Sequence, residues 1–307
     1  MTDQAQSKHV KKISGISFSD WKTILLKVKD QIGENNVSIV SAGVAFYGFL
    51  AVFPAIAAIV SIYGLAMDPQ SIENQLSQIT GVMPQQVYDI LKDQLEKLTK
   101  TPGSTLGWSM AIGILFSLWS ANKGIKSMFT GVDIAYGTKN TRGFFKKNWL
   151  TLLFTIGAII LVILSMVLIV AFPALIDTLG LPSGIESLII YGRWLLLAAL
   201  VIWFLGMIYK HAPFKPTPNF KWVLPGALLS TILWLLASWG FSFYVSNFGS
   251  YGEMYGSISA VIVMLLWLFL SSFIILLGAE LNTEIEKFSG HNASSDTNLQ
   301  MPTICSV

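Results

Sequence analysis

Residues 254–279 read MYGSISAVIVMLLWLFLSSFIILLGA, a long apolar run without any Asp, Glu, Lys or Arg. An α-helix of about 20 apolar residues spans the hydrocarbon core of a bilayer, and a charge at its centre is costly. This stretch therefore predicts a transmembrane helix, which we place at about residues 255–280.

Other parts of the chain repeat this pattern. Four further stretches lack charged residues and are long enough to cross a membrane: Asn36–Met67, Thr101–Asn122, Asn148–Ile176 and Trp222–Gly252. A shorter apolar run can also span if Arg193 extends its charge to the interface. We predict an all-α bundle of about six spans, with five as the alternative, at about 37–66, 103–122, 148–176, 187–209, 222–247 and 255–280. Charged residues make up 12% of the chain, against roughly 25% in a soluble domain, so lipid is the solvent for most of it.

The distribution of Lys and Arg predicts the orientation. Sixteen of the twenty lie in the leader, in the connections after the second and fourth spans, and in the tail. The remaining four are Lys92, Lys97, Lys100 and Arg193. Because cytoplasmic connections of membrane proteins are enriched in Lys and Arg, both termini are predicted to be cytoplasmic.

Several segments outside the spans have patterns of their own. In the leader, residues 1–36, an amphipathic helix is predicted from Phe18 onward, with Ser17 and Asp20 as a capping box. It lies either on the inner leaflet or against the protein's own cytoplasmic ends. Residues 68–100 predict an external helical hairpin, with a solvated loop as the alternative. Residues 122–137 predict an interfacial helix, and the tail, 288–307, is predicted to be disordered after the transmembrane domain, 37–287.

Residues that could carry catalysis are scarce. His9, His211 and His291 lie in separate segments, with no partner at metal-ligand spacing. No phosphate-binding glycine loop or hydrolase motif is present. We therefore expect neither an enzyme nor a cofactor or metal site, and no nucleic-acid partner.

Ionisable residues lie at the edges of the spans. We predict one ion pair between Lys123 and Glu280 at the cytoplasmic side, and another between Arg193 and Glu253 at the outer side. The alternative for each is a side chain that extends separately to the interface.

Three groups of residues resemble a known family. The first span contains Ala45-Phe46-Tyr47-Gly48 and then Pro54 in mid-helix, and the second ends in Trp119-Ser120-Ala121-Asn122-Lys123-Gly124. The last span carries Tyr255-Gly256, Trp267 and Gly278-Ala279-Glu280-Leu281-Asn282. This pattern is similar to the YihY/virulence factor BrkB family of bacterial inner-membrane proteins, some of which were once labelled ribonucleases. Phe46, Ala51, Asn122 and Asp133 depart from the residues usual in that family.

The resemblance implies a multi-pass protein of the bacterial inner membrane that acts in envelope homeostasis. Our leading hypothesis is a transporter or exporter of a lipid or small solute, with a pathway along the first, second and sixth spans. The candidate pathway residues are Tyr47, Pro54, Trp119, Asn122, Lys123, Tyr255, Trp267, Glu280 and Asn282. The alternative is a non-transporting scaffold for envelope assembly, followed by a membrane-bound ribonuclease. Expected partners are membrane lipids and the transported substrate, and self-association is left open.

Overall fold

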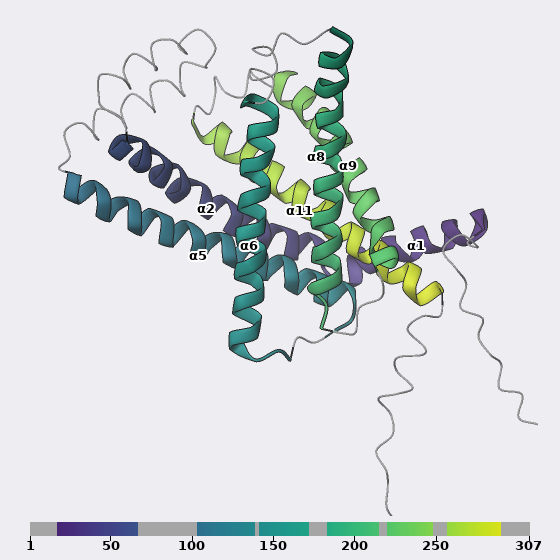
Figure 1. Ribbon diagram of the computed structural model, residues 1–307. Coiled ribbons are helices and arrows are strands. Elements are labelled where there is room, and N and C mark those ends of the chain that lie inside the picture. The colour runs from purple at the N-terminus through teal and green to yellow at the C-terminus, as the bar shows by residue number, and fades with distance from the viewer. Residues whose placement is uncertain are drawn as a thin grey trace, which may run out of the picture. The chain divides into compact units, whose positions relative to one another are not determined.

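The computed structural model describes residues 17–66, 103–138, 141–171, 183–214, 220–247 and 257–289. Its elements are helical throughout these ranges, as Figure 1 shows, which confirms the predicted all-α class. In chain order they are α1 (Phe18–Glu34), α2 (Val37–Ala66), α5 (Gly103–Ala135), α6 (Phe144–Met166), the π-helix η2 (Val167–Ala171), α8 (Ser183–His211), α9 (Phe220–Asn247) and α11 (Ser257–Phe288). The predicted external hairpin and disordered tail lie outside the described residues.

Five segments in the described ranges are long and apolar enough to cross a membrane: Val37–Ala55, Phe144–Ile169, Tyr191–His211, Phe220–Val245 and Ser259–Phe288. The predicted fourth span, whose charge-free run is the shortest by sequence, falls within the continuous helix α8. The predicted second span falls within α5, which is not one of the five. The protein is therefore a multi-pass helical membrane protein, while six spans and cytoplasmic termini remain predictions.

The chain divides into two compact units. One combines residues 1–45 with 125–307, and the other is residues 46–124, so α2 and α5 each contribute to both. In the described part of the second unit, the Ser117 hydroxyl of α5 donates a hydrogen bond to the carbonyl oxygen of Ala51 in α2, at 3.1 Å. Pro54 follows three residues later inside α2, and this side-chain bond to backbone is typical near a proline in a membrane helix.

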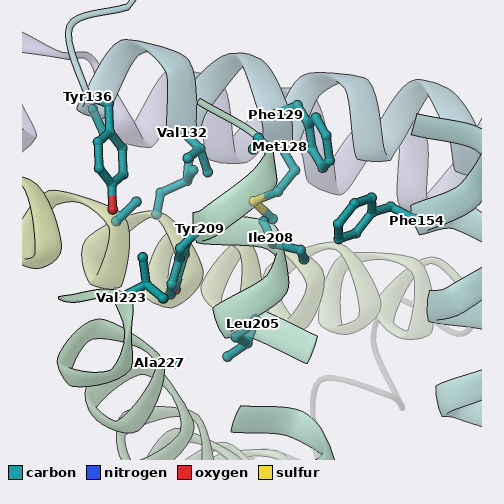
Figure 2. Packing of buried hydrophobic residues seen from close by; sticks show 14 of the residues in the cluster. Met128, Phe129, Val132, Tyr136, Phe154, Leu205, Ile208, Tyr209, Val223 and Ala227 are labelled. Carbon is teal, nitrogen blue, oxygen red and sulfur yellow. The ribbon is translucent and has the colours of Figure 1, made fainter. Parts of the chain in front are cut away.

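The core of the first unit is built where the end of α5 meets α6, α8, α9 and α11. Phe129, Val132, Tyr209 and Val223 are fully or almost fully buried there, and Figure 2 shows their side chains packed together. The apolar face that predicted an interfacial helix at 122–137 is thus covered by protein. The segment is the end of α5 rather than a separate helix, and its apolar partners come from helices distant in sequence. Its position at the inner interface stays a prediction.

Helix α1 begins with the predicted capping box. The Ser17 backbone N–H donates to Asp20 Oδ2 at 3.0 Å, and the Asp20 N–H donates to Ser17 Oγ at 3.3 Å. Its buried residues Ile24 and Val28 pack on Leu281 and Ile285 of α11. Of the two locations left open by the sequence, the structure therefore shows packing on the protein itself.

Candidate functional site

The predicted pathway residues are distributed over both compact units. Trp267, Glu280 and Asn282 lie on α11 in the first unit. Tyr47, Pro54, Trp119, Asn122 and Lys123 lie on α2 and α5 in the second. Tyr255 and Glu253 fall outside the described residues. A shared pathway through both units therefore stays a prediction.

In the second unit, Lys123 lies over an aromatic ring. Its Nζ atom is 5.5 Å from the centre of the Trp119 ring, a distance at which a cation–π interaction is favourable. Tyr47 packs edge-on against Phe46, with ring centres 5.4 Å apart. The predicted ion pair of Lys123 with Glu280 joins the two units and stays a prediction.

Arg193 on α8 was predicted to pair with Glu253. In the described residues its guanidinium lies 5.5 Å from the centre of the Trp194 ring, and Nη1 reaches the Ile169 carbonyl at 3.5 Å. Because Glu253 lies outside the described residues, this ion pair also stays a prediction.

Trp267 lines a groove between α9 and α11. The groove has a volume of about 570 Å³ and is lined by Ser238, Phe241, Ser242, Val245, Val263, Met264 and Trp267. Aromatic contacts hold the Trp267 ring, whose centre lies 5.2 Å from that of Phe241 and 5.7 Å from that of Trp234. Trp234 in turn donates its indole N–H to Ser271 Oγ at 3.0 Å. The groove thus combines a fixed aromatic wall with two serine side chains.

Glu280 is buried near the end of α11, with 1% of its surface exposed. Its Oε1 atom accepts a hydrogen bond from the Asn35 amide at 2.7 Å. Asn35 is the C-cap of α1, and Asn36 after it adopts the left-handed conformation (φ 51°) that turns the chain into α2. The other oxygen, Oε2, is buried and has no hydrogen-bond partner in the part of the chain that the structure describes. A buried carboxylate with an unused acceptor is a group that a ligand donor or a proton can satisfy.

Tyr136 contributes a second buried polar atom close to this end of α11. Figure 2 shows its hydroxyl directed toward the α11 ribbon. Burial raises the pKa of the phenol well above its ordinary value of 10, and the Glu286 carboxylate raises it further. Among the described residues, no group meets the geometric criteria for a hydrogen bond to the phenol oxygen. The Asn282 amide lies close enough to favour the ionised form, which opposes the rise in pKa.

Asn282 has a different role in the fold. Its Oδ1 atom accepts the Gly226 backbone N–H of α9 at 2.7 Å, and its Nδ2 atom donates to the Val223 carbonyl at 3.1 Å. Pro225 lies between these two residues and disturbs the hydrogen bonding of α9 locally. The Asn282 amide therefore joins α11 to α9 beside Pro225. Its oxygen and one of its two N–H groups are already hydrogen-bonded to the backbone of α9.

Sequence reasoning missed Tyr209 and Ser230, which lie beside this contact between α9 and α11. The Tyr209 hydroxyl donates to the Ile275 carbonyl at 2.7 Å, and the Ser230 hydroxyl donates to the Ile274 carbonyl at 3.0 Å. The helices approach closely here because Gly226 and Gly278 have no side chains. The spacing of Gly226 and Ser230, two small residues four apart, is the sequence signal that could have indicated a close helix crossing.

Sequence reasoning also missed Arg142, which fastens the start of α6 to the end of α8. Its guanidinium donates to the carbonyls of His211, Ala212 and Pro213 at 3.0, 2.9 and 2.9 Å. Nearby, Asp133 Oδ1 accepts the Phe214 backbone N–H at 3.1 Å and the Thr138 hydroxyl at 3.0 Å. The Arg142 bonds satisfy carbonyls at and just beyond the C-terminus of α8.

Potential metal ligands are dispersed over the described ranges. No set of three or more His, Cys, Asp or Glu side chains placed to hold a metal ion was found among the described residues. Glu284, which shares this end of α11 with Glu280, is paired with Lys287 at 2.6 Å.

These features define a polytopic α-helical membrane protein with a groove and a buried polar cluster on its last helix. The chain belongs to the family described as Virulence factor BrkB, which matches residues 28–301. The resemblance predicted from the sequence is thereby confirmed.

Individual relatives agree with this assignment. The chain is 30% identical over 253 residues to "Putative ribonuclease-like protein YfkH" of Bacillus subtilis (strain 168), covering 80% of this chain and 89% of that protein. It is 38% identical over 104 residues to a "UPF0761 membrane protein" of Xanthomonas axonopodis pv. citri (strain 306), covering 32% of this chain. A UPF0761 membrane protein of Xanthomonas oryzae pv. oryzae (strain MAFF 311018) matches to the same extent, and the chain spans about a quarter of each Xanthomonas protein. No solved structure matches.

Proposed function

We propose that the protein is a transporter or exporter, which moves a lipid or small solute across the bacterial inner membrane with both termini in the cytoplasm. The observation that carries the proposal is the groove between α9 and α11. It lies in two helices apolar enough to span the membrane, and Trp267 and the two serines give it apolar and polar surface together. Such a lining suits an amphipathic substrate, since binding sites combine apolar walls with a few polar groups.

The polar cluster at the other end of α11 supports the same proposal. Glu280 follows Trp267 by thirteen residues, which corresponds to roughly 20 Å along a helix. A substrate passing along α11 would thus meet an aromatic groove at one level and a buried carboxylate at another. In the proposal, Tyr47, Trp119, Asn122 and Lys123 line the same pathway, with Pro54 as a hinge.

The test is transport by the purified full-length protein in liposomes. Efflux of trapped carboxyfluorescein reports solute flux. Lipid scrambling is reported when dithionite bleaches nitrobenzoxadiazole-labelled phosphatidylethanolamine of the inner leaflet as well as that of the outer leaflet. We expect activity in at least one assay, and a loss of that activity in Trp267→Ala. Trp239→Ala is the matched control, because Trp239 on α9 is 76% exposed and does not line the groove.

Absence of both activities in the wild-type protein would reject the transporter proposal and favour the scaffold. Crosslinking in cells would then be expected to recover one partner repeatedly, without dependence on Trp267 or Glu280. The word ribonuclease in the name of the Bacillus subtilis relative belongs to that protein and is not part of the proposal.

A further inference from the structure

A second groove, separate from the one lined by Trp267, lies between α6 and α8. It has a volume of about 480 Å³, and its lining on α6 repeats every three or four residues at Leu150, Leu153, Gly157, Ile160 and Leu164. This spacing places the lining residues on one face of the helix. Both helices are apolar enough to cross a membrane, so the natural occupant of this groove in a bilayer is a lipid acyl chain.

The facing stripe on α8 contains Leu200, Trp203, Met207 and His211. It ends at the C-terminal end of α8, where His211 lines the groove. The hydrogen bonds from Arg142 to the carbonyls of His211 and Ala212 hold this end beside the start of α6. The two stripes therefore end together.

Basic residues lie on the terminal turns of both helices at that shared end. Lys146 and Lys147 precede Leu150 by four and three residues, so they extend the α6 stripe. Lys210 follows Met207 by three residues on α8. Lys146 is exposed and the other two are half-buried, and none of the three forms an ion pair with an acidic side chain within the described ranges.

The start of α6 is itself short of negative charge. Its first turn contains no acidic residue, and its N-cap, Gly143, supplies no side-chain hydrogen bond. Two lysines beside the positive end of a helix dipole are unfavourable unless an anion compensates them, and free backbone N–H groups there bind phosphate readily. An anion bound beside the apolar groove would therefore be stabilised by these positive charges.

We propose that the α6–α8 groove binds an anionic glycerophospholipid. One acyl chain lies between the stripes of α6 and α8, and the phosphate lies among Lys146, Lys147, Lys210 and the first backbone N–H groups of α6. Phe145 and Trp149 are 86% and 72% exposed at the same end, as suits aromatic side chains at a membrane interface. Basic pockets between membrane helices bind anionic head groups in this manner. The site does not depend on the proposed transport activity.

The test is native mass spectrometry of the full-length protein in detergent, titrated with dioleoylphosphatidylglycerol or dioleoylphosphatidylcholine. We expect the wild type to retain phosphatidylglycerol preferentially. Replacing the three lysines together (Lys146→Gln, Lys147→Gln and Lys210→Gln) should weaken its retention roughly tenfold or more. The matched control removes the same charge from exposed positions on α1, by Lys22→Gln, Lys27→Gln and Lys29→Gln, and should retain the lipid.

A second pair of variants tests the acyl-chain part of the site. Ile160→Trp fills the groove and should abolish retention of phosphatidylglycerol. Ile163→Trp should not, because Ile163 is on the same helix and similarly exposed (56% against 58%) but does not line the groove. Equal retention by the lysine variant and its control would overturn the proposal. So would competition by sn-glycerol 3-phosphate as strong as that by the whole lipid, because this would show an anion site without an acyl-chain site.

Discussion

The side-chain amide of Asn282 accepts the backbone N–H of Gly226 at 2.7 Å and thereby fastens α11 to α9. The same amide donates to the Val223 carbonyl, on the other side of Pro225. A residue that the sequence analysis placed among the candidate pathway residues thus holds two helices together.

Asn282→Leu should destabilise the protein. The substitution leaves the Gly226 N–H and the Val223 carbonyl buried without their partner, and each unsatisfied group costs roughly 1–3 kcal/mol. The measurement is thermal unfolding in detergent, followed by tryptophan fluorescence. Asn148→Leu on α6 is the control and should shift the midpoint much less. An Asn282→Leu protein as stable as the wild type would show that the amide contacts contribute little.

Gly278→Ala should be poorly tolerated. An added Cβ would overlap Ser230 Oγ and lie 2.6 Å from the Tyr209 hydroxyl, so α9 and α11 would have to separate. Gly240→Ala in α9 offers a comparison, because no atom of the described residues outside its own stretch of helix lies within 4 Å of its Cβ position. We expect a lower yield and unfolding temperature for Gly278→Ala only. Equal behaviour of the two alanine variants would argue against a close crossing at Gly278.

Arg142→Lys should loosen the junction between α6 and α8. A guanidinium reaches three carbonyls in a fixed fork, which one ammonium group cannot reproduce. Hydrogen–deuterium exchange of residues 205–214 should therefore rise in this variant. Lys221→Gln, which removes an exposed charge from the start of α9, should leave the exchange of that segment unchanged. Wild-type protection in Arg142→Lys would mean that the three bonds are dispensable.

Tyr136 should remain un-ionised at alkaline pH while the protein is folded. The raised pKa of a phenol means that the folded state favours the neutral form, so its contribution to stability is complete below pH 10 and is lost as pH rises further. In an absorbance titration of folded protein up to about pH 11, Tyr136→Phe should leave the tyrosinate amplitude unchanged. A lower amplitude in Tyr136→Phe would show that the phenol ionises readily.

The predicted ion pair between Lys123 and Glu280 can be tested by exchange of charges. If the pair forms, Lys123→Glu and Glu280→Lys should each lower stability, and the double variant should recover part of the loss. Thermal unfolding of the three variants gives the coupling energy directly. A double variant no more stable than either single one would exclude the pair. The two residues would then act through the contacts observed for each, Lys123 with Trp119 and Glu280 with Asn35.

Local chemistry made much of the architecture predictable. Apolar runs without charge indicated the spans that became α2, α6, α9 and α11, because each residue in such a run meets the same lipid solvent. Ser17 and Asp20 indicated the start of α1, because a capping box involves residues only three apart. The family pattern of Gly278-Ala279-Glu280-Leu281-Asn282 pointed to the part of α11 where the buried polar groups lie.

Errors arose where a residue's partner is distant in the chain. The apolar face containing Val132 was correctly identified, but the separate helix expected there is the end of α5, packed on other helices. A helix stripe shows that something apolar must cover it and does not say whether lipid or protein does so. Arg142 and Tyr209 were overlooked because their partners, the carbonyls of residues 211–213 and 275, are groups that every residue type has.

The sequence by itself determined that this is a helical membrane protein of the BrkB family, because hydropathy, charge and family motifs are properties of short stretches. Only the tertiary structure decided what the polar residues of α11 do. The side-chain amide of Asn282 is hydrogen-bonded to the backbone of α9 and holds the two helices together. Glu280 keeps one buried oxygen unpaired within the described residues, because only Asn35 of the described chain reaches its carboxylate. That difference depends on which polar groups lie within hydrogen-bond distance of each side chain, and the packing of the helices sets it.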